Sequence, residues 1–283
     1  MEPLEPGLSP RRRVTILLQV FTVLVVAEIL LVYSNLTGDA LFSYAGLLVD
    51  LVLVFALPIV ASRIVPKDRA LASLLGALVL APLLRVVSLA IPFAPSSPIL
   101  WLALVSVALL LASAAIMYAQ RLQPGDVFLG IGRRRYIPFN VGLAVVGFLL
   151  GSLEFQILHP APCAALPCPN PILWSGDPGS EPFLIAVIVV FVATGVVEEL
   201  IFRGILLRTG IRVLGRRAAL LYVTLVFAAL HVGFLSAAEL LFVFFLGLLF
   251  GVIVLVTESL WGAAVAHATA NIALYLILPF MGP

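Results

Sequence analysis

PFLIAVIVVFVATGVVEELIFRGILL, residues Pro182–Leu207, is an almost unbroken apolar segment that contains Glu198, Glu199 and Arg203. A helix needs about 20 residues to cross the apolar core of a bilayer, so the segment is long enough to span one. Ionisable side chains inside a membrane span are costly, and they typically pair with one another or mark a functional site. The segment therefore predicts a membrane-spanning helix that carries a polar site.

The composition of the whole chain also indicates a membrane protein. Of its 283 residues 63% are hydrophobic and 11% are charged, whereas charged residues make up about a quarter of an ordinary soluble domain. We therefore expect an all-α, polytopic integral membrane helix bundle with about eight or nine transmembrane helices, in contact with membrane lipid. The expected spans are 14–33, 42–64, 70–93, 98–119, 139–158, 182–207, 218–233, 238–256 and 260–281.

The basic residues predict the orientation of these spans, because cytoplasmic loops collect Lys and Arg. With nine spans and a cytoplasmic N-terminus, all of the 16 basic residues except Arg85 and Arg203 fall in cytoplasmic segments. We therefore expect a protein of the plasma membrane with its N-terminus in the cytoplasm. Membrane insertion explains this distribution of charge, so no nucleic-acid partner is expected.

A polar connection, RLQPGDVFLGIGRRRYIP at residues 121–138, divides the chain into two expected parts. Residues 1–136 form an N-terminal four-span membrane region of unknown role. Residues 137–283 form a membrane-embedded core, and its motifs lie within residues 182–275.

Two residue pairs outside the core motifs carry structural expectations. Asp50 and Arg85 both lie about 12 Å below the outer ends of their helices, at a rise of 1.5 Å per residue. We expect them to form a buried ion pair that fixes the helix register. Cys163 and Cys168 lie in a proline-rich outer loop, where a disulfide and two free thiols are both compatible with the sequence.

Helical spacing assigns provisional geometry to the ionisable residues of the late spans. Glu199 and Arg203 are four residues apart, so they share a helix face and are expected to form a salt bridge. Glu198 points about 100° away from Glu199 and is left free to act as a general base. His267 and Asn271 are also four residues apart and project from one face.

Two chemical arrangements of these residues are compatible with the sequence. In the first, Glu198 and His231 hold and deprotonate a water, while Asn271, helped by His267, donates hydrogen bonds to the oxyanion of an attacked amide. In the second, Glu198, His231 and His267 bind a catalytic zinc ion with water in the fourth position. Polar contacts between helices without catalysis are the structural alternative.

Three motifs follow one another in the last third of the chain: Glu198-Glu199-x-x-x-Arg203, Phe227-x-x-x-His231 and His267-x-x-x-Asn271. In this order and on three late spans, they resemble the motifs of the CPBP family, the CAAX proteases and bacteriocin-processing enzymes also called the Abi family. Three ordered motifs are more specific than any single one, and the resemblance covers about residues 182–275.

The resemblance implies an intramembrane endopeptidase related to the type II CAAX prenyl endopeptidase, which removes the last three residues of prenylated proteins. It implies that Glu198 and His231 activate the water and that Asn271 serves the oxyanion, with His267 beside them. Members of the family are described both as metalloproteases and as metal-independent glutamate proteases, so zinc and a metal-free mechanism both stay open. The implied substrate is a membrane-associated or lipidated peptide or protein.

Function and placement in the cell have alternatives. A non-catalytic membrane scaffold or immunity protein, or a transporter of a small solute, would retain the same charges for structure or for a pathway. Lys67 is the single lysine among the 16 basic residues, which suggests a prokaryotic, GC-rich genome. Glu199 and His267 lie about 13 Å and 10 Å from the inner ends of their helices, so the site is expected to face the cytoplasmic leaflet.

Overall fold

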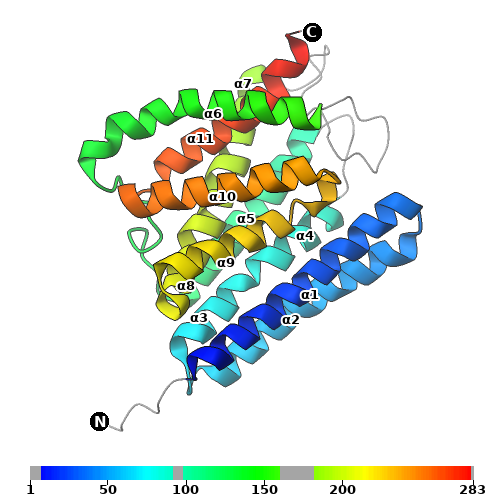
Figure 1. Ribbon diagram of the computed structural model, residues 1–283, viewed down its shortest axis with the longest axis vertical. Coiled ribbons are helices and arrows are strands. Elements are labelled where there is room, and N and C mark those ends of the chain that lie inside the picture. The colour runs from blue at the N-terminus through cyan, green and yellow to red at the C-terminus, as the bar shows by residue number, and fades with distance from the viewer. Residues whose placement is uncertain (1–7, 92–97, 160–181, 282–283) are drawn as a thin grey trace.

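The computed structural model describes residues 8–91, 98–159 and 182–281, and Figure 1 shows their arrangement. Within these residues the chain is helical and contains no strand. Nine of the helices in the described part are long and apolar enough to cross a membrane. The expectation of a polytopic all-α membrane bundle is confirmed, as is the upper of the two expected span counts.

The helices follow the hydropathy pattern closely. The first two spans are α1 (Pro10–Thr37) and α2 (Ala40–Ile64). The third is divided into α3 (Arg69–Leu78) and α4 (Leu80–Ala90), and the next two are α5 (Pro98–Ala119) and α6 (Ile137–Leu158). The sixth runs from α7 (Phe183–Val190) to α8 (Leu207–Leu214), and the last three spans contain α9 (Arg216–Ala229), α10 (Ala237–Thr257) and α11 (Trp261–Ile272).

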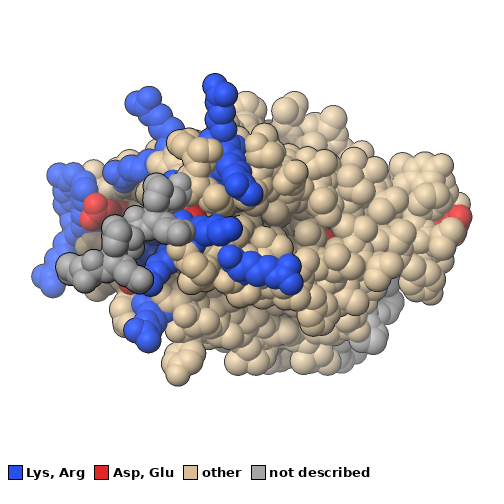
Figure 2. Space-filling view, turned by 90° about the horizontal axis from the view of Figure 1, so that it is seen from below, with Lys and Arg blue, Asp and Glu red and all other residues tan. Residues whose placement is uncertain are grey.

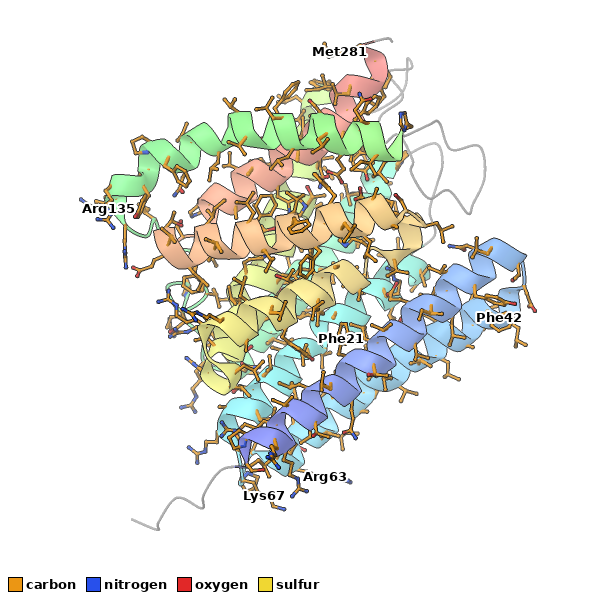
Figure 3. The ribbon with its side chains drawn as sticks, in the orientation of Figure 1. Phe21, Phe42, Arg63, Lys67, Arg135 and Met281 are labelled. Carbon is orange, nitrogen blue, oxygen red and sulfur yellow. The ribbon has the colours of Figure 1, made fainter. Side chains whose placement is uncertain are left out.

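The basic side chains gather at one end of the bundle. Figure 2 looks at this end, where blue Lys and Arg side chains cluster. Figure 3 places Arg63 and Lys67 at this end of the α1–α2 hairpin and Phe42 at its other end. Arg13 binds Asp68 at 2.6 Å, and Asp68 also caps α3 by accepting from the Leu71 amide, so the first and third spans are joined there. We call this region the basic end; that it faces the cytoplasm remains a prediction.

The polar connection between the two expected parts, residues 121–138, is bonded to the turn between α10 and α11. Arg133 forms a 2.7 Å ion pair with Glu258, and this contact lowers the pKa of the Glu258 carboxyl. The Leu260 amide donates to the Phe128 carbonyl at 2.8 Å, and the Trp261 indole donates to the carbonyl of Leu129 at 3.0 Å. These bonds anchor the start of α11, the helix that carries His267 and Asn271.

The predicted ion pair between Asp50 and Arg85 is wrong. The Arg85 guanidinium instead donates to both carboxylate oxygens of Glu28, at 2.9 Å and 2.7 Å. Asp50 is fully buried, and its oxygens accept no hydrogen bond from the described residues. Counting residues from a helix end gives the depth of a side chain but not its direction around the helix axis, and Glu28 on α1 takes the position beside Arg85.

The sixth span changes its helical geometry where the charged motif lies. Between α7 and α8 the backbone is π-helical at Phe191–Glu198 and again at Leu200–Leu206. Wider π-type turns are rare and are often found at functional sites. In this helix they surround Glu198, Glu199 and Arg203.

Candidate active site

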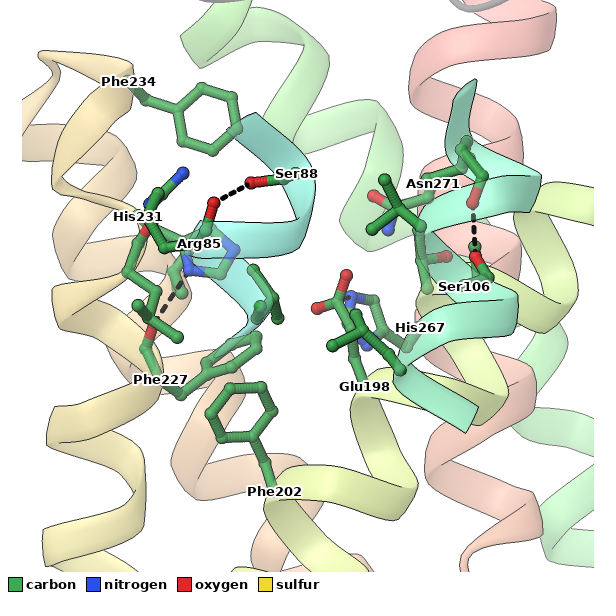
Figure 4. A pocket seen from close by; sticks show the side chains of 18 of the residues that line it. Arg85, Ser88, Ser106, Glu198, Phe202, Phe227, His231, Phe234, His267 and Asn271 are labelled. Carbon is green, nitrogen blue, oxygen red and sulfur yellow. Dashed lines mark hydrogen bonds and ion pairs between the residues drawn. The ribbon is translucent and has the colours of Figure 1, made fainter. Parts of the chain in front are cut away.

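The four motif residues Glu198, His231, His267 and Asn271 line a single cavity of about 430 Å³. Figure 4 shows this cavity from close by. Most of the remaining lining is apolar, including Phe202 and Phe250, and it comes from helices that are distant in the sequence. The structure therefore brings the candidate residues of three separate spans into one space.

Glu199 is the centre of a buried chain of hydrogen bonds. Its Oε1 atom accepts from Arg203 Nη1 at 2.8 Å, as the spacing of four residues predicted, and it lies 2.8 Å from His267 Nδ1. The guanidinium of Arg203 also lies over the Phe227 ring, 4.2 Å from its centre, which adds a cation–π contact. Glu199 and Arg203 are fully buried, so neither side chain is open to the cavity, and Glu199 contacts His267 from behind.

Glu198 is the acidic residue of the pair that reaches the cavity. Its side chain is 24% exposed, and its Oε2 atom lies 4.0 Å from His267 Nε2. This distance is too long for a direct hydrogen bond, but it allows one water molecule to bond to both groups. The two sides of His267 are thus distinct, because Nδ1 is held by Glu199 and Nε2 faces Glu198.

His231 lies on the opposite wall of the cavity from Glu198 and His267 (Figure 4). Its Nδ1 atom is 2.9 Å from the Phe227 carbonyl oxygen. A carbonyl can only accept, so Nδ1 carries the proton and the neutral ring keeps Nε2 as an acceptor. His267 is the histidine beside the Glu198 carboxylate in this geometry, and a water held by Glu198 and His231 remains a prediction.

Close packing between α6 and α11 orients His267 and Asn271. Gly147 and Gly151 of α6 lie directly against the backbone of Ala266 and Ala270, and a Cβ atom at either glycine would collide with those carbonyls. Small residues at a spacing of four let membrane helices approach in this way. Each alanine immediately precedes a site residue, so this contact determines the direction in which that face of α11 points.

Residues 180–273 match a family model, that of the type II CAAX prenyl endopeptidase Rce1-like proteins. This region is Rce1-like. The match contains all three motifs and confirms the resemblance to the CAAX proteases, whose activity is that of CAAX-type intramembrane endopeptidases. No curated protein and no solved structure matches the chain.

The Rce1-like region does not form a metal-ligand set in this structure. Among the described residues there is no group of three or more His, Cys, Asp and Glu side chains that could hold a metal ion. The proposed zinc ligands are Glu198, His231 and His267, but the two histidines approach from different walls of the cavity. The donor set does not fit a tetrahedral zinc site.

The cavity also contains polar residues that sequence reasoning did not assign to the site. Arg85, Ser106 and Glu154 line it, although all three lie outside the Rce1-like region. Glu154 on α6 lies close to Glu239 on α10, whose two carboxyl oxygens have no hydrogen-bond partner among the described residues. An acidic residue within each of two apolar spans was the signal that could have directed attention to Glu154 and Glu239.

The cavity extends away from the basic end. Trp101 lies near the start of α5, whose other end precedes Arg121, and Phe234 follows the end of α9 that is remote from Arg216. The expected opening toward the cytoplasmic leaflet therefore receives no support from the lining residues. Counting residues placed Glu199 and His267 near the inner ends of their helices, but such a count contains no information about the direction in which the cavity walls extend.

The cysteine pair of the outer loop, Cys163 and Cys168, lies outside the described residues.

Proposed function

We propose that the chain is an intramembrane endopeptidase that hydrolyses a peptide bond in a membrane-associated substrate of the prenylated CAAX type. The observation that carries the proposal is the position of Glu198 Oε2 in the cavity, 4.0 Å from a histidine nitrogen whose partner nitrogen is held by Glu199. A carboxylate and an imidazole at this separation can hold one water between them.

The proposed reaction begins with this water. Its oxygen attacks the carbonyl carbon of the scissile amide, and its proton passes to Glu198. Asn271 lies one turn beyond His267 on the same helix, so its side-chain amide is suited to donate a hydrogen bond to the oxyanion that forms. When the carbon–nitrogen bond breaks, the proton on Glu198 passes to the leaving amine, which regenerates the carboxylate.

His231 takes a different role in this scheme. Its Nε2 atom is a hydrogen-bond acceptor on the wall opposite Glu198. A substrate chain between the two walls would present an N–H group to this nitrogen, so His231 orients the scissile bond. Glu199 and Arg203 keep His267 in place from behind.

The cavity lining supports a lipidated or strongly apolar substrate. Its many apolar residues include Phe202, Phe227 and Phe250. Apolar walls of this kind favour lipid-soluble groups, because such groups have no bound water to lose when they enter the cavity from the membrane. The placement of both histidines supports a glutamate-activated water and not a zinc-bound one. The plasma membrane, a cytoplasmic N-terminus and a prokaryotic source remain predictions from the sequence.

Cleavage of a fluorogenic peptide tests this function. The full-length protein in detergent is incubated with a prenylated peptide and with the same peptide lacking the lipid, beside the variant Glu198→Gln. We expect the wild type to cleave the prenylated peptide and the Glu198→Gln variant to cleave neither peptide. A folded wild type that cleaves neither peptide, nor any member of an unbiased peptide library, would contradict the proposal and favour the scaffold or transporter.

A further inference from the structure

We propose that Arg85, held by Glu28, is a positioning residue for His231. The inference rests on the proposed function. It gives the helices that precede the Rce1-like region a part in catalysis, because Glu28 lies on α1 and Arg85 lies on α4.

The contacts of Arg85 carry the first step. Its Nε and Nη2 atoms donate to the two carboxylate oxygens of Glu28, at 2.9 Å and 2.7 Å, and Nη2 also donates to the Leu230 carbonyl oxygen at 2.7 Å. The Glu28 side chain is 2% exposed and that of Arg85 is 21% exposed. A two-pronged carboxylate contact fixes the plane of a guanidinium, so Glu28 determines where Arg85 meets Leu230.

The second step is the position of the Leu230 carbonyl. It belongs to the same peptide group as the His231 amide, which donates to the Ala228 carbonyl at 2.9 Å. Arg85 and Ala228 therefore hold this peptide group at both of its ends. Carbonyls at the end of a helix have no helical partner of their own, and without Arg85 the Leu230 carbonyl would lose the side-chain contact that orients it.

The third step is the lack of regular helix at His231 itself. The residue has φ −99° and ψ 1°, and the segment Val232–Phe234 that follows is a single 3-10 turn packed against α1. Backbone of this kind does not hold its own position as a continuous helix does. Among the helices that precede the Rce1-like region, α1 packs against this turn and Arg85 on α4 binds the Leu230 carbonyl just before it, so both restrict where the His231 ring stands in the cavity (Figure 4).

A purely structural role for the Glu28–Arg85 ion pair predicts a different result from a positioning role, and the variants must separate these two roles. Removing Arg85 alone would leave Glu28 as an unpaired buried charge, which commonly unfolds a protein. The main variant is therefore Glu28→Gln/Arg85→Gln, which removes both charges together. The matched control is Arg13→Gln/Asp68→Asn, which removes the other ion pair between the first and third spans, at the basic end.

The measurement is kcat and KM for peptide cleavage by the full-length protein, together with its thermal unfolding midpoint. Misplacing a catalytic group by about 1 Å can lower the rate on the order of 10²-fold. We expect a loss of that order in kcat with unchanged KM for the main variant, and no loss for the control. In a His231→Ala background the same double substitution should cause no further loss, because it acts through His231.

Each other outcome contradicts the assignment. An unchanged kcat in the Glu28→Gln/Arg85→Gln variant would overturn it. So would a further loss of kcat in the His231→Ala background as large as the loss in the wild-type background. If the main variant does not fold, Arg85→Lys replaces it: lysine keeps the charge opposite Glu28 but lacks the planar fork that reaches Leu230 as well, and a folded Arg85→Lys protein with wild-type kcat would equally overturn the proposal. A wild type without any cleavage would refute the proposed function instead.

Discussion

His267 Nδ1 lies 2.8 Å from Glu199 Oε1, and this bond determines that the other ring nitrogen, Nε2, faces the cavity. The same carboxylate oxygen accepts from Arg203, so one acidic residue of the pair is used entirely for support. The neighbouring Glu198 is thereby the acidic residue available to a substrate. This division of roles between adjacent glutamates leads to the first two predictions.

Glu198→Gln is expected to remove peptide cleavage with little effect on folding. A positioned general base contributes about 10²–10⁴-fold to a rate, and the amide cannot take the proton of the water. Among the described residues Glu198 has no ion-pair partner closer than the 4.0 Å contact with His267, so no strong interaction of that part of the fold is lost. The rate of peptide cleavage and the thermal unfolding midpoint are measured together; a large fall in the midpoint would contradict a purely catalytic role.

Glu199→Ala is expected to lower the stability of the fold, and to lose activity as a consequence. It leaves the Arg203 guanidinium buried without its carboxylate, and breaking a buried pair in this manner costs about 3–5 kcal/mol. Thermal unfolding in detergent should show a strongly lowered midpoint, with loss of activity as a consequence. Replacing both partners, as in Glu199→Gln/Arg203→Met, should restore much of the stability but not the orientation of His267. Equal stability of the single variant and the wild type would count against the hydrogen-bonded chain.

Gly151→Ala is expected to lower both stability and activity. The added Cβ would collide with the backbone carbonyl of Ala270, and overpacking of this kind costs about 1–3 kcal/mol. The two helices must separate, which moves Asn271 away from the oxyanion. Gly142→Ala on the same helix is the matched control, because nothing lies within 4 Å of its added Cβ; similar behaviour of the two variants would refute the packing argument.

A strong chelator is expected to leave peptide cleavage unchanged. His231 and His267 stand on different walls of the cavity, and the described residues contain no group of three His, Cys, Asp or Glu side chains placed to hold a metal ion. Activity is measured before and after exhaustive chelation, and again after zinc is added back. Activity that disappears with the chelator and returns with zinc would show that the site closes around a metal in solution.

The sequence by itself determined the features that depend on local helix geometry. Hydropathy over about 20 residues is sufficient to place a span, and nine helices of the described chain agree with the expected segments. The salt bridge of Glu199 and Arg203 was also predictable, since a spacing of four residues places two side chains on one face of a helix. Counting residues along each helix also placed Glu199 and His267 at similar depths, about 13 Å and 10 Å from the inner ends of their helices.

Only the tertiary structure decided which side chains meet across helices. Arg85 binds Glu28 and not Asp50, and His267 is the histidine beside Glu198 while His231 lies on the opposite wall of the cavity. Depth can be counted along a helix, but the rotation of each helix about its axis depends on packing with distant segments. The glycine and alanine contact of α6 with α11 and the 2.7 Å bond from Arg85 to the Leu230 carbonyl are such contacts. They join residues far apart in the chain, and no local pattern specifies them.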